Sequence, residues 1–186
     1  LNNPSVLKYA AGESVGSIVA GGNGWGTAAN QLRNPLGLFV DLDGNIYIAD
    51  TDNHRVQKWV PGATEGITVA GNGANGSAAE QLSYPEGVYV DLEGNIYVSE
   101  RDNQRVSKFV SGSLTGTIVA GGNGSGGEAN QLNYPGGIFV DLDGNIFIAD
   151  RNNSRIQKWA PGAIEGKTVA GGNWGSGNSQ FQGPTD

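Results

Sequence analysis

The chain has 186 residues and a formal net charge of −7, from 11 basic and 18 acidic side chains. Because nucleic acids and anionic membrane surfaces are bound by clustered Lys and Arg, this balance argues against both as partners. The sequence has no cysteine and no apolar run near the roughly 20 residues that span a bilayer. We therefore expect no thiol chemistry, no nucleic-acid binding and no membrane insertion.

A strict internal repeat dominates the sequence. Residues 34–59, NPLGLFVDLDGNIYIADTDNHRVQKW, return from residue 84 as YPEGVYVDLEGNIYVSERDNQRVSKF and from residue 134 as YPGGIFVDLDGNIFIADRNNSRIQKW. A fixed period predicts an array of one supersecondary unit, in which length counts units rather than domains. The 32 glycines recur at fixed positions, which indicates turns rather than disorder.

In the first unit, β-branched and aromatic residues between turn signals predict four short strands, at 38–41, 46–50, 55–59 and 67–71. The sequence DGN at 43–45 predicts a tight turn, and TDN at 51–53 predicts a polar bend. A long Gly/Asn/Ala loop leads to the next unit, and only SAAEQL at 77–82 has the composition of a short helical turn. Four antiparallel strands cannot cover both of their faces, so the units must stack.

The repeated residues resemble a known family. Pro35, Gly37, Asp41, Gly44-Asn45, IYIAD and the Asp50-x-x-Asn53-x-Arg55 segment are similar to the NHL-repeat β-propeller signature, and the match returns in the next two units. One position departs from it, because Glu100 stands where the other units have Asp50 and Asp150. The resemblance implies radial stacking of blades, and it implies little about function because propellers carry many unrelated activities.

Alignment to the 50-residue repeat predicts the boundaries of the units. Lys8 aligns with Lys58, so the start of the chain supplies the outer half of a blade, with strands near 6–9 and 17–20. The expected fold is all-β: a propeller-like array of four-stranded antiparallel blades, with three complete 50-residue repeats and partial blades at both ends. The expected division is 1–33 (outer half-blade and loop), 34–83, 84–133 and 134–183 (repeats), and 184–186 (start of the next unit).

One polar trio recurs in every unit. Asp50, Asn53 and Arg55 join the ends of the second and third strands, and a carboxylate beside a cation could be interpreted as a catalytic pair. An active site is normally singular, whereas this trio is repeated, so we interpret it as a structural network. Its members are Asp50, Asn53, Arg55, Glu100, Asn103, Arg105, Asp150, Asn153 and Arg155.

No metal, cofactor or catalytic residue is predicted. The alternating oxygens of Asp41, Asp43 and Asn45 suggest a calcium loop, but the bidentate Glu of an EF-hand does not follow, so a hairpin turn is the better interpretation. The Gly-rich loops lack the following helix and the Gly-Lys-Ser/Thr of a phosphate site. His54 is the single histidine and is expected to be a solvent-exposed turn residue.

The tryptophans fall into two groups. Trp59 and Trp159, with Phe109 at the equivalent position, could form a sugar-stacking ladder, but their spacing favours packing between blades. Trp25 and Trp174 lie in Gly-rich loops without aromatic equivalents at 75 or 125, and these two are the candidate contact aromatics.

Three sequons are candidates for glycosylation, at Asn75, Asn123 and Asn152. They matter only if the chain is secreted, and on that ground we expect an extracellular or cell-surface location.

Together these features predict a non-catalytic binding or assembly scaffold that interacts through its interblade loops and unfinished blade ends. The expected partners are another protein or the chain itself, and a glycan is a further candidate. Because open strand edges favour addition of another chain, head-to-tail association into an extracellular filament is one expectation. Two alternatives stay open: part of a metal-dependent propeller lyase or hydrolase with catalytic residues in other blades, and the sensor ectodomain of a membrane receptor or kinase.

Overall fold

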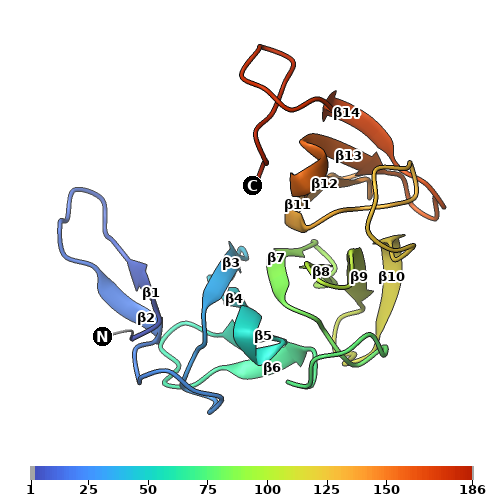
Figure 1. The fold of residues 1–186 in the computed structure, drawn as a ribbon. Helices are drawn as coiled ribbons and strands as arrows, with labels where there is room; N and C mark the ends of the chain where they lie inside the picture. Colours follow the sequence, from blue (N-terminus) through green and yellow to red (C-terminus); the bar gives the residue numbers. More distant parts are fainter. Residues whose placement is uncertain (1–2, 186) are drawn as a thin grey trace.

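A computed structural model describes residues 3–185 as a succession of small antiparallel sheets (Figure 1). One sheet is two-stranded, three are four-stranded, and in each the strands are paired in chain order, as the sequence predicts. The two-stranded sheet is β1 (Ser5–Lys8) and β2 (Ser17–Gly21). The four-stranded sheets are β3 (Pro35–Val40), β4 (Ile46–Asp50), β5 (Arg55–Trp59), β6 (Ile67–Ala70); β7 (Pro85–Val90), β8 (Ile96–Glu100), β9 (Arg105–Phe109), β10 (Gly116–Gly121); and β11 (Pro135–Val140), β12 (Ile146–Asp150), β13 (Arg155–Trp159), β14 (Lys167–Gly171).

Local structure differs from the prediction at three places. The first strand of the unit begins at Pro35 rather than Leu38, with a shift of register between these two residues. The bend after β4 is the 3-10 helix η1 (Thr51–Asn53), and η2 (Arg151–Asn153) follows β12 in the same way. The 77–82 segment forms no helix and contains only a single turn, closed by a hydrogen bond from the Gln81 N–H to the Ala78 carbonyl.

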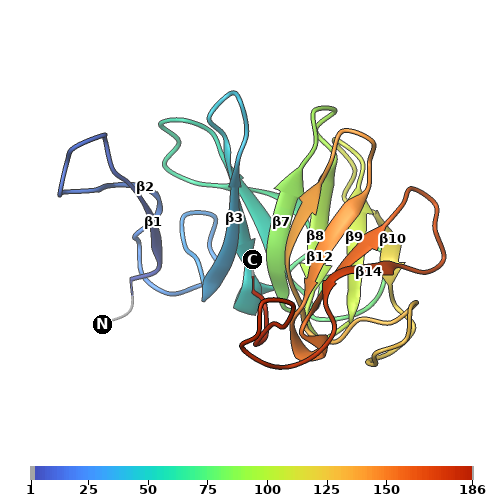
Figure 2. The ribbon, with the colours of Figure 1, turned by 90° about the horizontal axis from the view of Figure 1, so that it is seen from above.

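The sheets are arranged as an arc around the innermost strands. In Figure 1, β3, β7 and β11 lie next to one another toward the centre, while β6, β10 and β14 lie on the outside, and Figure 2 shows the same array turned by 90°. Glycine permits this close approach: a Cβ on Gly87 would lie 2.6 Å from the carbonyl oxygen of Gly136 on the neighbouring strand. The repeated Pro-x-Gly of the sequence therefore marks the contact between blades.

The hydrophobic core lies between successive sheets. Trp59 and Trp159 are each 2% exposed and Phe109 is fully buried, so the prediction that they pack between blades is confirmed. Their clusters combine residues of neighbouring sheets, such as Val56 and Leu82 with Val98. Each unit therefore depends on the next one for burial of its apolar face.

The array has two ends, defined by the direction of the strands. The hairpin end carries the tight turns between the first two strands of each four-stranded sheet, at 41–45, 91–95 and 141–145. The crossover end carries the turns after β4, β8 and β12 and the long loops that lead into β3, β7 and β11.

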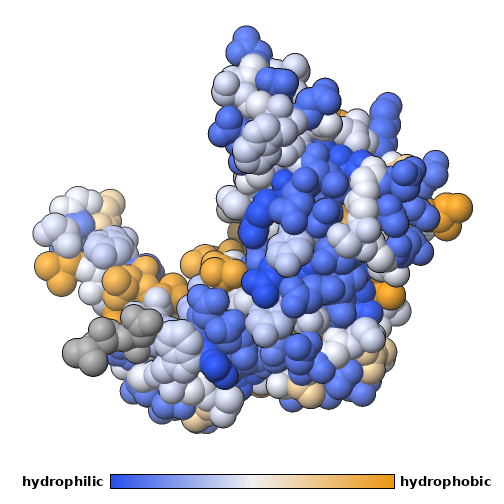
Figure 3. Space-filling model, viewed as in Figure 1, coloured by the Kyte–Doolittle hydropathy of each residue, from blue (hydrophilic) through white to orange (hydrophobic). Residues whose placement is uncertain are grey.

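The face of β3 is unusually apolar. Leu36, Leu38 and Val40 are about half exposed, whereas Val88 and Val90, the equivalents of the last two in β7, are 6% and 5% exposed. Figure 3 shows exposed apolar surface on this side of the molecule. In the described residues, the sheet that precedes β3 has only two strands, and no inner strand covers these side chains.

Candidate binding site at the crossover end

The predicted polar network fixes the crossover end of every blade. Both carboxylate oxygens of Asp50 are used: Oδ1 accepts the backbone N–H of Arg33 at 2.6 Å, and Oδ2 accepts Asn53 and Arg55, each at 2.8 Å. Arg55 also donates to the carbonyl oxygens of Thr27, Ala28 and Gln31 in the incoming loop. The trio thus ties the long loop to the sheet that it enters.

The same contacts recur in the other two units. Asn153 and Arg155 bind the Oδ2 atom of Asp150 at 2.8 and 2.7 Å, and Asn103 and Arg105 bind the carboxylate of Glu100, each at 2.6 Å. Ion pairs that are buried and recur in each unit are typical of a structural network.

A second substitution accommodates the longer Glu100. Where the other units have Gln57 and Gln157, this unit has Ser107, whose hydroxyl donates to Oε1 of Glu100 at 2.6 Å. The shorter side chain leaves room for the additional methylene group of Glu100. The replacement of Asp by Glu100 is therefore compensated by Ser107 in the same blade.

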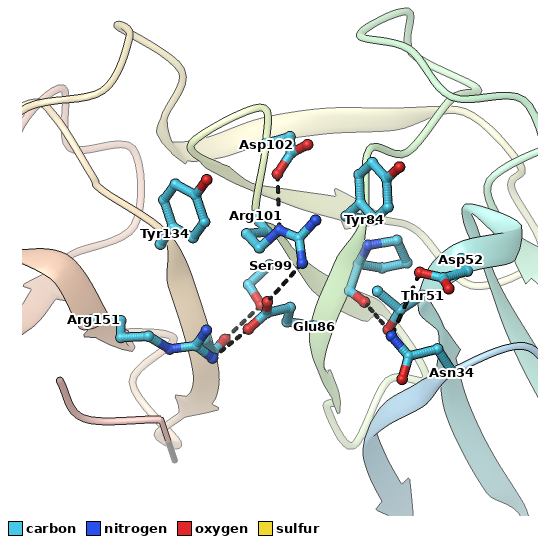
Figure 4. Close-up of polar contacts among 12 residues, drawn as sticks. Asn34, Thr51, Asp52, Tyr84, Glu86, Ser99, Arg101, Asp102, Tyr134 and Arg151 are labelled. Atoms are coloured by element: carbon cyan, nitrogen blue, oxygen red, sulfur yellow. Dashed lines mark hydrogen bonds and ion pairs between the residues drawn. The ribbon is translucent and has the colours of Figure 1, made fainter.

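The units differ in chemistry at one innermost position, where Leu36, Glu86 and Gly136 are equivalent. Glu86 is only 6% exposed. Its carboxylate faces two guanidinium groups at the crossover end: Arg101 at 3.6 Å from Oε1, and Arg151 in direct contact with Oε2 (Figure 4). Because a buried charge is costly without partners, this pairing is what permits a carboxylate on the innermost strand.

Two tyrosine side chains lie beside Arg101. The guanidinium carbon of Arg101 lies 4.4 Å from the ring centroid of Tyr84 and 5.9 Å from that of Tyr134 (Figure 4). Its Nε atom also contacts Asp102 at 2.8 Å. Burial alone would lower the pKa of Arg101, but Asp102 and Glu86 raise it above the ordinary value, so this group is a fixed positive charge.

His54 belongs to this end: it lies in the turn after η1, as expected, but the expectation that it is solvent-exposed is wrong, because it is half-buried. Its ring meets Tyr84 edge-on at a centroid distance of 4.6 Å, and its Nδ1 accepts the backbone N–H of Tyr84 at 3.2 Å. Gln104 takes the equivalent role by accepting the N–H of Tyr134 at 2.7 Å. Position 54 therefore joins neighbouring blades. Desolvation lowers the pKa of His54 below its ordinary value, which favours the neutral ring that this hydrogen bond requires.

A pocket of about 520 Å³ lies beside the inner strands and reaches Glu86 and Arg151 of this cluster. Its lining is apolar along β3, β7 and β11, with Leu38, Val88 and Ile138, and becomes charged at Glu86 and Arg151. The arrangement suits a ligand that has an apolar part and polar atoms at its end.

The candidate contact aromatics and the sequon asparagines are exposed. Trp25 and Trp174 are 44% and 71% exposed in their long loops, where each pairs through its backbone with a buried or partly buried residue, Leu32 or Phe181. Exposure leaves both available as contact aromatics, which stays a prediction. The three sequon asparagines Asn75, Asn123 and Asn152 are exposed.

The sequence analysis did not find Glu86, Arg101 and Arg151, because it compared the units at the signature residues and in the loops but not at positions 36 and 51 and their equivalents. The signal that would have found them is a change of chemistry between near-identical units at these positions. Leu36, Glu86 and Gly136 differ in this way, as do Thr51, Arg101 and Arg151.

Among residues 3–185, no group of three or more His, Cys, Asp and Glu side chains has the proximity needed to hold a metal ion. The same part of the chain contains no helix with the length and apolar character of a membrane span.

Comparison with known proteins places the chain by its repeats. The NHL-repeat profile matches residues 32–59, 82–109 and 132–159. A crystal structure of a protein of unknown function from Bacteroides thetaiotaomicron is similar, with a TM-score of 0.68 and 18% identity over 92% of this chain and 44% of that one. No curated protein matches the sequence.

Two further solved structures share the fold. An auxiliary nutrient binding protein from B. thetaiotaomicron has a TM-score of 0.62 and 14% identity, over 91% of this chain and 42% of that one. A chain of a nidogen/laminin complex has a TM-score of 0.61 and 15% identity, over 83% of this chain and 51% of that one. The chain thus spans about half the length of these structures or less, and at such identities the likeness shows the fold alone.

Proposed function

Because this chain belongs to the NHL-repeat family of β-propeller proteins, we propose that it is a non-catalytic binding module that holds a polypeptide ligand at the crossover end of its inner strands. The observation that carries this proposal is the Glu86 cluster. It gathers two arginines and two tyrosines in one place, although the units that supply them are otherwise nearly identical. A device repeated in every unit serves the fold, whereas the Glu86 carboxylate occurs in one unit only and gathers arginines from two units, which points to recognition.

The cluster has the composition of a protein-binding hot spot. Tyr and Arg are enriched at such positions, because they offer a large contact area together with hydrogen-bond donors. Arg101 is held on one side by Glu86 and on the other by Asp102, so little side-chain entropy is lost when a ligand binds. Tyr134 is 40% exposed and supplies an accessible aromatic surface beside it.

The side chains that could act as a general base are already used in ion pairs or hydrogen bonds, which supports binding rather than catalysis. The carboxylate of Glu86 pairs with arginines, and those of Asp50 and Asp150 are used by the repeated networks. The Nδ1 atom of His54 is used by a backbone N–H. A general base needs a free acceptor within reach of a substrate proton. The sequons support an extracellular location as part of the proposal.

Selection from a random peptide library on the immobilised chain tests this function. The variants Tyr84→Asn and Arg101→Thr introduce the residues that the first unit has at 34 and 51, so the backbone of the repeat accommodates them. We expect enriched peptides whose Kd rises about 10-fold or more in each variant. The control Glu165→Thr, a change to the residue that the second unit has at 115 in an exposed turn of the hairpin end, should leave the Kd unchanged. Failure to enrich peptides, or equal binding to all variants, would contradict the proposal.

Assembly is a second candidate function, favoured by the apolar face of β3. Exposed Leu36, Leu38 and Val40 occupy positions that neighbouring strands bury elsewhere in the array, so an added strand pair from another molecule would cover them. The mass of the native chain in solution tests this candidate. Oligomers that dissociate in the Leu38→Ser variant would support assembly, and a wild-type monomer at high concentration would count against it.

A further inference from the structure

Each inner hairpin carries a leucine at its tip that is almost fully exposed. Leu42, Leu92 and Leu142 are 95%, 77% and 93% exposed, in the sequences DLDG, DLEG and DLDG. Tight turns are ordinarily polar, and nothing in the described part of the chain covers these side chains. The hairpin end thus presents one apolar side chain per blade, at the opposite end of the array from the Glu86 cluster.

Grooves connect these leucines. One groove, of about 530 Å³, is lined by Leu42 and Leu92, and a second, of about 300 Å³, by Leu92 and Leu142. Tyr89 lines both. It lies in a row of aromatic rings, at centroid distances of 5.0 Å from Phe39 and 5.5 Å from Phe139. The two grooves therefore share a leucine and an aromatic floor.

The rim of the grooves is acidic. Asp43, Glu93 and Asp143 follow the leucines and are exposed, and no ion pair engages them in the described part of the chain. A second carboxylate, such as Asp41 or Asp141, precedes each leucine. Hydrogen bonds from Asn145 lower the pKa of Asp141, so that carboxylate is ionised at neutral pH.

The lysines of this end balance only part of the charge: the Nζ of Lys108 lies 3.9 Å from the carboxylate of Asp91, and in the described part of the chain no lysine pairs with the rim carboxylates that follow the leucines. Lys58, Lys108 and Lys158 lie over aromatic rings of their own sheets, with Nζ 5.2, 5.0 and 5.4 Å from the ring centroids. Each hairpin thus sets two carboxylates against one lysine that is held against a ring. A second copy of this acidic face would meet like charge, which disfavours self-association through it.

We propose that the hairpin end is a second interaction surface, which binds an extended polypeptide segment bearing large apolar and basic side chains. The apolar side chains of the segment would enter the two grooves between Leu42, Leu92 and Leu142. Its Lys or Arg side chains would pair with Asp43, Glu93 and Asp143 at the rim. Charge complementarity selects this occupant over an acidic peptide, and the repetition of the groove suits a segment that spans more than one blade.

Two random peptide pools test the surface, one built from Leu, Lys and Ser and the other from Leu, Glu and Ser. Retention of each labelled pool on the immobilised chain is measured at low and at physiological salt. The informative variants are Leu92→Ser and Glu93→Lys. Their matched controls are Ile164→Ser and Glu165→Lys, the same kinds of change in a turn of the hairpin end whose residues line neither groove.

We expect the Lys pool to be retained about 10-fold more than the Glu pool. Leu92→Ser and Glu93→Lys should each remove most of this retention, while Ile164→Ser and Glu165→Lys should leave it in place. Three results would overturn the proposal: no retention of the Lys pool, equal loss in Glu93→Lys and Glu165→Lys, or equal loss in Leu92→Ser and Ile164→Ser. The second would mean that only the net charge attracts the pool, and the third that its apolar contacts are unspecific. Wild-type self-association that Leu92→Ser abolishes would also overturn it, by making a second copy the occupant.

Discussion

Glu86 on β7 and Arg151 at the start of η2 are 65 residues apart in sequence and form a direct ion pair across two neighbouring blades. The pair joins an innermost strand to the crossover end of the next sheet. Arg101, from the same blade as Glu86, approaches the other carboxylate oxygen. One acidic side chain thus organises the arginines of two blades, and this relationship underlies the proposed binding site.

Removal of the Glu86 charge should destabilise the chain moderately. The carboxylate is buried, but Arg101 and Arg151 are 25% and 30% exposed, so solvent screens the pair. We expect Glu86→Gln to lower the free energy of unfolding by about 1–2 kcal/mol in urea titrations. Glu80→Gln, in an exposed loop, should change it by less than about 0.5 kcal/mol. Equal effects of the two variants would contradict the role of Glu86.

The contact between inner strands should be intolerant of a methyl group. A Cβ at Gly87 would lie 2.6 Å from the Gly136 carbonyl oxygen, whereas one at Gly127 would find its nearest neighbour at an ordinary 3.6 Å. We expect Gly87→Ala to cost about 1–3 kcal/mol, because two backbones would have to separate. Gly127→Ala is the control and should be nearly neutral by thermal and urea unfolding. A neutral Gly87→Ala would show that the strands are not so close.

His54 should make stability depend on pH. Its folded pKa is below the ordinary 6.5 because burial disfavours the charged ring and outweighs Asp52 and Asp102, which raise it. As pH falls, the His54 ring is therefore protonated at a higher pH in the unfolded chain than in the folded chain. The stabilisation is complete above about pH 6.5 and is lost as pH decreases through the folded pKa.

The variant His54→Gln isolates this effect, because Gln104 already accepts the equivalent backbone N–H in the next unit. Between about pH 7.5 and 5.5, the wild type should lose more stability than His54→Gln in urea titrations. NMR titration of the single histidine should give a pKa below 6.5. Identical pH dependence of the two proteins, or a histidine pKa above 6.5, would contradict the account.

The three sequons should not be equally occupied in a secretory expression host. The side-chain amide of Asn123 donates to the carbonyl oxygens of Gly121 and Asn130, and that of Asn152 donates to Asn133. Asn75 is exposed, and we expect it to carry the most glycan. Intact mass before and after Asn75→Gln measures this, with Asn123→Gln as the comparison. A greater loss of glycan mass in Asn123→Gln would contradict the expected order.

Much of the fold could be predicted from the sequence, because the repeat displays the same turn and strand signals three times. The strands at 46–50 and 55–59 were predicted with their observed bounds. The beginning of β3 was not, because Pro35 joins the sheet through a shift of register that follows from pairing with Asp50 rather than from local composition.

The candidate site could not be predicted in the same way. Its residues come from different units, and Glu86 contacts Arg151 only because the blades stack against each other. His54 illustrates the same limit, since its contact with Tyr84 arises between blades. Interactions between units are fixed by the geometry of the array, which no single unit encodes.

Hydrogen exchange of the chain with and without its selected peptide ligand shows where on the array the peptide binds. We expect slower exchange at the crossover end, in residues 84–86, 101–104 and 151–154, with no change in the hairpin turns 41–45 and 141–145. Protection that is confined to the hairpin turns or to the face of β3, with none around Glu86, would contradict the proposed binding site.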